Sequence, residues 1–144
     1  MHRRSGTFFL TLVALCAFGA EYDRSSALDI SQGAIGRPLE SYTLRDTEGQ
    51  PFAISELRGK PLVVSMIYTS CHHICPTITR NLRDKIEVAQ EALGEDAFNV
   101  VTVGFDWRVD TPDRMREFES RLGVDRVPNW HFLAIEAGVV DELS

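Results

Sequence analysis

The chain has 144 residues, which is enough for one globular domain. Its composition is that of an ordinary soluble protein, with 44% hydrophobic and 25% charged residues. The net charge at pH 7 is −6, and the 15 lysine and arginine residues are scattered rather than gathered in a stripe. The chain therefore lacks the basic surface of a nucleic-acid-binding protein, and no nucleic acid is expected among its partners.

The first twenty residues have the pattern of an export signal. Arg3 and Arg4 give a basic start, and residues 7–20 contain no charged side chain. This apolar stretch is too short to span a bilayer comfortably, and cleavage after Gly19 would leave small residues where signal peptidase prefers them. Residues 1–20 are therefore predicted to be a cleaved signal peptide or, alternatively, a short membrane anchor.

A polar segment and a small hairpin follow the export signal. Residues 21–32 are polar and without periodicity, so they are predicted to be a linker before a domain that spans residues 33–144. Within the domain, residues 42–53 predict a hairpin, because two short strand-like runs flank a turn at Glu48-Gly49. Residues 54–57 predict a single helical turn.

Apolar strands and amphipathic helices alternate in the rest of the chain. Strands are predicted at residues 62–68, 100–105 and 130–134, and the first is a continuous β-branched run typical of a strand buried on both faces. A helix is predicted from Pro76 to about Leu93, and a second helix follows Thr111-Pro112, a favourable helix start. The apolar stripe of the first helix consists of Ile78, Leu82, Ile86, Ala89 and Leu93. A last helix begins near residue 136.

This alternation predicts an α/β domain with a mostly parallel central sheet and flanking helices, because βαβ crossovers join parallel strands. In open α/β sheets, ligands bind beyond the carboxyl ends of the strands. Cys71 and Asp106 each follow the end of a predicted strand. The sequence therefore predicts the functional edge of the sheet near these two residues.

The cysteines are the main candidates for chemistry. The chain has three, and Cys16 falls in the apolar core of the export signal, which leaves Cys71 and Cys75. At the start of a helix, the partial positive charge of the backbone favours thiolate over thiol. Two neighbouring thiolates are soft ligands for Cu(I) or, to a lesser degree, zinc. The same pair can also be a redox pair or an inert structural disulfide, and the spacing alone leaves these three interpretations open.

Two sequence motifs resemble the Sco/SenC family of copper-binding proteins that help assemble cytochrome c oxidase. The first is the run from Tyr68 to Thr77 (YTSCHHICPT), and the second is the run from Val103 to Pro112 (VGFDWRVDTP). The two motifs stand in the family's order, about thirty residues apart. The resemblance covers roughly residues 33–143 and implies a thioredoxin-like fold.

The resemblance implies a copper site made of Cys71, Cys75 and a distant histidine. The position of that histidine falls past Ser144, as do the closing hairpin and final helix of the fold, so the domain is expected to be incomplete. The resemblance implies Cu(I) as the bound metal, with Cu(II) as a further form. His72 stands where the family often has proline.

Other polar residues near the pair have ordinary interpretations as well. His72 and His73 are expected to be exposed loop residues, or auxiliary copper ligands, since imidazole also suits copper. Asp106 is expected to face the cysteine loop and to orient or charge-balance the site, whereas the run Asp110-Thr111-Pro112 can be explained by helix capping alone. His131 is expected to be a strand residue with ordinary packing and not the distant histidine of the family.

Two functions from different classes remain open. The favoured one is a copper-binding assembly factor, which delivers Cu(I) to the copper site of a cytochrome c oxidase subunit or prepares its cysteines. The alternative is a thiol–disulfide oxidoreductase that acts through Cys71 and Cys75 on another copper or thiol protein. A peroxiredoxin ranks last, because Tyr68 occupies the place of the threonine that precedes its nucleophile. Export predicts the periplasm or the outer face of the inner membrane as the location, with a tether through the N-terminus.

Overall fold

A computed structural model describes residues 24–38 and 42–142 of the chain. The chain divides into two compact units, residues 1–38 and residues 39–144. In the first unit, helix α1 (Arg24–Gly33) lies where the sequence predicted a linker. None of the residues of α1 is buried. A helix without a buried face needs no apolar stripe, and for this reason the sequence pattern did not indicate it. The predicted signal segment and Cys16 lie outside the described residues.

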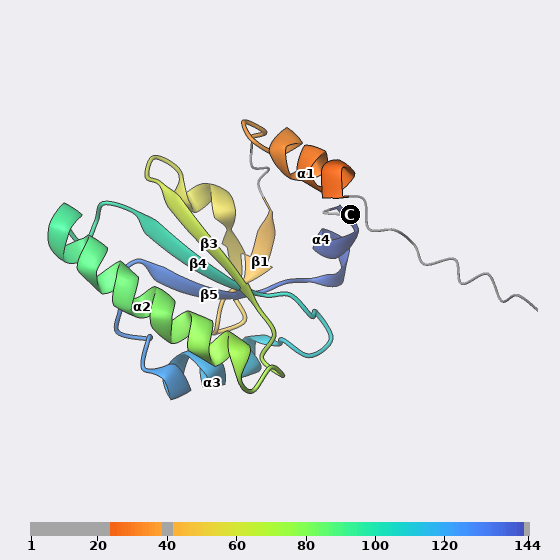
Figure 1. Ribbon diagram of the computed structural model, residues 1–144. Helices are drawn as coiled ribbons and strands as arrows, with labels where there is room; N and C mark the ends of the chain where they lie inside the picture. Colours follow the sequence, from red (N-terminus) through yellow and green to blue (C-terminus); the bar gives the residue numbers. More distant parts are fainter. Residues whose placement is uncertain (1–23, 39–41, 143–144) are drawn as a thin grey trace, which may run out of the picture. The chain divides into compact units, whose positions relative to one another are not determined.

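The second unit contains one five-stranded sheet (Figure 1). Its strands are β1 (Thr43–Arg45), β2 (Pro51–Ala53), β3 (Leu62–Ile67), β4 (Asn99–Gly104) and β5 (Trp130–Ala134). They lie in the order β2-β1-β5-β4-β3. Strands β3, β4 and β5 are parallel, and β1 pairs antiparallel with both β2 and β5. The predicted mostly parallel α/β sheet and the predicted hairpin are therefore both confirmed.

Four helical segments accompany the sheet, namely η1 (Ile54–Leu57), α2 (Ile74–Leu93), α3 (Pro112–Leu122) and α4 (Ala137–Glu142). Helix α3 begins where the sequence predicted, because the Thr111 hydroxyl accepts a hydrogen bond from the Arg114 amide at 3.4 Å. It ends at Gly123, whose φ of 64° suits glycine. Helix α2 begins two residues earlier than predicted, which places Cys75 inside its first turn.

The two faces of the sheet carry separate apolar clusters. Helices α2 and α3 pack on one face, where Ile86, Met115 and Phe118 join Val100 and Phe132 from the strands. The other face carries a smaller cluster that includes Leu44, Leu57, Val101, Val103 and Leu133. Because both faces of β4 meet apolar side chains, all six of its residues are buried.

The prediction that the first strand is buried on both faces is wrong. Strand β3 is the edge of the sheet, and the side chains of Val64 and Met66 are 51% and 59% exposed. The predicted apolar stripe of α2 is also wrong in part, since Ile78 and Leu93 are exposed. The buried Gln90 lies on the inner face of α2, where its side-chain amide donates to the Pro128 carbonyl at 3.0 Å. This hydrogen bond allows a polar residue at an inner position.

Candidate metal centre

The cysteine pair lies at the junction between β3 and α2. The loop after β3 turns at Cys71, whose amide donates to the Tyr68 carbonyl at 3.0 Å. Cys75 follows in the first turn of α2, and its amide donates to the Cys71 Sγ at 3.4 Å. Both cysteines are free thiols and partly exposed. The two sulfurs therefore lie together at the carboxyl end of β3 and the amino end of α2, as the sequence predicted.

The surroundings of the two thiols shift their pKa values in opposite directions. Hydrogen bonds from the amide and then the thiol of Cys75 lower the pKa of Cys71. Burial raises the pKa of Cys75, and the neighbouring Cys71 thiol and the negative charge of Asp110 raise it further. Cys71 is therefore the more acidic thiol of the pair, and Cys75 keeps its proton to higher pH.

Asp110 makes a set of contacts that sequence reasoning missed. Its side chain is fully buried, and its Oδ1 accepts hydrogen bonds from the Thr69 amide at 2.8 Å and the Thr69 hydroxyl at 2.6 Å. Its Oδ2 accepts a hydrogen bond from the Asp106 amide at 2.8 Å. The helix cap predicted for the run Asp110-Thr111-Pro112 is confirmed at Thr111, but capping does not account for the contacts of the Asp110 carboxylate. Asp110 joins the cysteine loop to the loop after β4.

The last residue of β4 leaves room for this carboxylate. A Cβ added to Gly104 would lie 2.6 Å from the Cβ of Asp110 and 2.6 Å from the Sδ of Met115. Real Cβ atoms do not approach other heavy atoms so closely. The close approach therefore explains a glycine in an otherwise β-branched strand, and this glycine is the signal in the sequence that marks a tightly packed neighbour.

The other predicted site residues lie in less constrained places. Asp106 is half-buried, and its Oδ1 accepts a hydrogen bond from the Arg108 amide at 3.1 Å, within its own loop. The residue that contacts the cysteine loop is Asp110. His72 and His73 are exposed on the loop between the cysteines, as expected. His131 is half-buried in β5, with its ring centroid 5.0 Å from that of Phe52, which confirms ordinary strand packing.

The donor set of the pair suits a soft metal ion. Two neighbouring thiols are the ligands that Cu(I) prefers, and both cysteines are partly exposed. Among the described residues, no group of three or more His, Cys, Asp and Glu side chains could hold a metal. Within the described residues, Cys71 and Cys75 are therefore two candidate metal ligands without a third.

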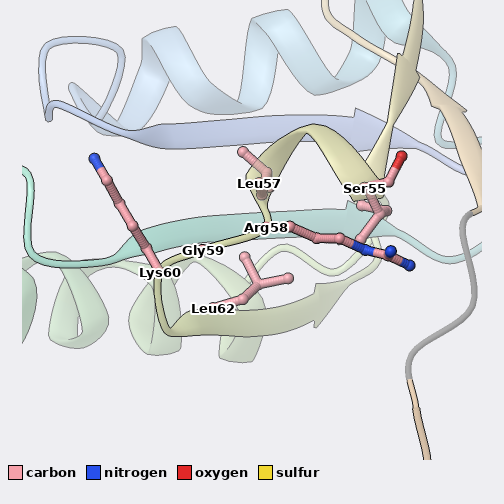
Figure 2. A pocket seen from close by; sticks show the side chains of 7 residues that line it. Ser55, Leu57, Arg58, Gly59, Lys60 and Leu62 are labelled. Atoms are coloured by element: carbon pink, nitrogen blue, oxygen red, sulfur yellow. The ribbon is translucent and has the colours of Figure 1, made fainter.

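A hollow elsewhere in the domain is not part of this centre. Figure 2 shows it between η1 and the start of β3, lined by Ser55, Leu57, Arg58, Lys60 and Leu62. Lys60 belongs to an exposed ion pair with Asp96 at 3.2 Å. The hollow lies at the amino end of β3, whereas the cysteines follow its carboxyl end, so it offers no access to the thiols.

The sequence profile of the SCO1/SenC family matches residues 33–128. This match includes both cysteines, Asp106 and Asp110. The chain belongs to the SCO1/SenC family. A SCO1 protein homologue of Bacillus subtilis is 24% identical to this family member over 126 residues, which are 86% of this chain and 58% of the relative.

Solved structures of other family members share the fold of this SCO1/SenC protein. A SCO1/SenC family lipoprotein of Bacillus anthracis has a TM-score of 0.64 at 23% identity, covering 76% of this chain and 64% of that one. Bradyrhizobium japonicum ScoI, solved with copper bound, has a TM-score of 0.58 at 24% identity, covering 72% and 62%. The Bacillus subtilis protein BsSco, described as a member of the Sco family of cytochrome c oxidase assembly proteins, has a TM-score of 0.57 at 24% identity, covering 72% and 59%. The predicted thioredoxin-like fold is confirmed.

Two further facts describe the extent of this SCO1/SenC chain. It spans about three fifths of the length of the Bacillus subtilis relative that it matches. Within residues 24–38 and 42–142, no helix is both long and apolar enough to cross a membrane.

Proposed function

We propose that this SCO1/SenC protein binds Cu(I) through Cys71 and Cys75 and serves the copper site of cytochrome c oxidase. It would deliver Cu(I) to an oxidase subunit or prepare the cysteines there. The observation that carries the proposal is the short contact between the Cys75 amide and the Cys71 Sγ, which sets two free thiols side by side at a helix start. The copper bound to Bradyrhizobium japonicum ScoI and the assembly role of the BsSco family support it.

The arrangement of the pair suits a metal that must be released again. Cys71 has the lowered pKa of the two and is partly exposed, so its sulfur is suited to exchange Cu(I) with a partner's ligands. His72 and His73 are exposed on the same loop and are the candidates for an auxiliary ligand, which the loop would have to change conformation to bring to the metal. Asp106 is the remaining candidate for charge balance at the site.

Cu(I) binding is tested with Cys71→Ser and Cys75→Ser. We expect each variant to lose stoichiometric binding, because a single thiolate is a poor Cu(I) site. The assay is an anaerobic titration of the purified chain with Cu(I) in competition with a coloured Cu(I) chelator. His131→Ala is the matched control, since this histidine packs on Phe52 away from the cysteines, and it should bind like the wild type. Wild-type affinity in both cysteine variants would disprove the proposal.

The opposite pKa shifts of the two thiols favour thiol–disulfide exchange as a second function. The Cys71 thiolate would attack a partner disulfide, forming a mixed disulfide and releasing one partner thiol. The Cys75 thiolate would then attack the Cys71 sulfur, releasing the second partner thiol and leaving a Cys71–Cys75 disulfide. Two electrons and two protons pass to the partner. Reduction of a disulfide peptide by the metal-free chain, absent in Cys71→Ser, would favour this function.

Export to the periplasm or to the outer face of the inner membrane completes the proposal. The basic start and the apolar run of residues 7–20 support it, as does the lipoprotein nature of the Bacillus anthracis relative. N-terminal sequencing of chain recovered from a membrane or periplasmic fraction should begin near Ala20 or Glu21 if the signal is cleaved, and at the start of the chain if it is retained as an anchor. Recovery of the chain from cytosol alone would disprove export.

A further inference from the structure

We infer that Asp110 is a positioning residue for the cysteine pair: its buried carboxylate fastens the cysteine loop to the loop after β4 and so holds the two sulfurs in binding geometry. The inference rests on the proposed function of the pair. Asp110 acts on the pair through its hydrogen bonds with Thr69, two residues before Cys71.

The contacts of Asp110 connect segments that are far apart in the sequence. Thr69 lies 41 residues before Asp110, in the loop that ends at the cysteines, and supplies both an amide and a hydroxyl donor. The Asp106 amide, from the loop after β4, supplies the third donor. Asp110 itself belongs to the loop after β4, so its Oδ2 braces its own loop while its Oδ1 holds the cysteine loop. Neither loop can move away from the other without leaving a buried carboxylate oxygen without its partners.

The surroundings of Asp110 keep the carboxylate in one place. Its side chain is fully buried, and its own amide donates to the Asp106 carbonyl at 2.7 Å. Gly104 packs against its Cβ so closely that no larger residue fits there. The next residue, Thr111, caps α3. Asp110 is therefore held in place by its own loop, by Gly104 and by the start of α3, as a residue that positions another group must be.

Geometry and charge predict opposite effects of Asp110 on copper binding. A nearby negative charge disfavours thiolates, and burial together with the Cys71 thiol and Asp110 raises the pKa of Cys75. If charge were its main effect, neutralising Asp110 would strengthen Cu(I) binding. If positioning is its main effect, the same change would weaken binding. The sign of the change separates the two.

The first test is Asp110→Asn, which keeps the size of the side chain. The amide oxygen can still accept from Thr69, but the amide nitrogen would face the Asp106 N–H, donor against donor, so the hydrogen bond that fixes the side chain of residue 110 within its own loop is lost. We expect Cu(I) affinity to fall by about tenfold or more, as for residues that orient metal ligands. Unchanged or tighter binding by the folded variant would overturn the inference.

A matched control separates positioning from general destabilisation. Asn99 is also buried and also makes a side-chain hydrogen bond, donating to the Leu57 carbonyl at 3.2 Å, but it begins β4 at the opposite end of the sheet. Asn99→Ala should lower the midpoint of thermal unfolding and leave Cu(I) affinity within about twofold of wild type. An equal loss of affinity in Asn99→Ala would show that stability alone explains the effect of Asp110.

Two variants of Thr69 test the same positioning role if Asp110→Asn does not fold. Thr69→Val removes the hydroxyl donor without changing charge, and Thr69→Ser keeps it. We expect Thr69→Val to weaken Cu(I) binding by about threefold, the usual worth of one hydrogen bond, and Thr69→Ser to bind like the wild type. Equal affinities in the two variants would contradict the inference.

A metal-free measurement distinguishes failure of the inference from failure of the proposed function. Oxidised glutathione takes two electrons and two protons from Cys71 and Cys75, yielding their disulfide and two reduced glutathione molecules. The equilibrium constant measures how well the two sulfurs are held together. We expect Thr69→Val to lower it by about threefold relative to Thr69→Ser. If the wild type binds no Cu(I) but shows this difference, the proposed function fails and the positioning role stands. If the two constants are equal, the positioning role fails.

Discussion

Glu119 on α3 makes the stability of the domain depend on pH. Its side chain is half-buried, and burial, followed by the negative charges of Asp125 and Glu48, raises its pKa from 4.5 to about 7. A pKa that is raised on folding means that the folded state binds the proton more tightly. The stability due to Glu119 is therefore fully present below about pH 4.5 and is lost as the pH rises through 7.

The size of the effect follows from the shift after a correction for exposure. A rise in pKa of this size would correspond to ~3 kcal/mol for a fully buried group. Because Glu119 is only half-buried, solvent screens the burial and the like charges, and we expect about 1 kcal/mol. Replacing Glu119 by Gln removes the charge and keeps the shape. Glu119→Gln should therefore stabilise the domain at pH 8 and have almost no effect at pH 4.5.

Thermal unfolding at the two pH values measures this difference. For a domain of this size, about 1 kcal/mol raises the midpoint by about 4–8 °C. The matched control is Glu117→Gln on the same helix, because Glu117 is exposed and makes only a surface ion pair with Arg114 at 3.6 Å. Comparing each variant with wild type at the same pH cancels other titrating groups. A gain in Glu119→Gln that is the same at both pH values, or a loss at pH 8, would refute the reasoning.

Two further predictions concern the site. Gly104→Ala should destabilise the domain by about 2 kcal/mol in urea unfolding, because the new Cβ would clash with Asp110 and Met115, and an unchanged midpoint would contradict the close packing. Near neutral pH, iodoacetamide should modify Cys71 before Cys75, because hydrogen bonds from Cys75 lower the pKa of Cys71 while burial raises that of Cys75. Peptide mass spectrometry of the partly modified chain shows which cysteine reacts first. If Cys75 is modified before Cys71, the assignment of Cys71 as the more acidic thiol is wrong.

The fold was predictable from sequence where local pattern and packing agree. The limits of β5, the single turn at residues 54–57 and the start of α3 at Thr111-Pro112 all follow from short-range signals. Burial of β3 was not predictable, because an apolar β-branched run is equally consistent with a central strand and an edge strand. Its position at the edge depends on which strands pair, and pairing is a long-range property.

The candidate metal ligands could be predicted from the sequence, whereas the contacts of Asp110 that hold their loop could not. The spacing of Cys71 and Cys75 beside a strand end indicated the thiol pair directly. The run Asp110-Thr111-Pro112 is a common helix start, so its sequence indicates only a cap, and only the folded chain brings Thr69 to Asp110 across 41 residues. Asp106 was chosen for its place at the strand end, yet its carboxylate accepts a bond from its own loop. Contacts between loops that are far apart in the chain produce no periodic pattern of residues, so the sequence alone does not indicate them.

Because β3 lies at the edge of the sheet, its backbone is expected to open to solvent more readily than that of β4. Strand β4 has strands on both sides, whereas β3 has a strand on one side only, so the outward backbone groups of β3 face solvent. Amide hydrogens of β4 should exchange with deuterated water far more slowly than the outward amides of β3. The strand that leads directly into the thiol pair is thus the one whose backbone solvent reaches first. The loop that carries Cys71 and Cys75 therefore follows the strand whose backbone is least protected among the three parallel strands.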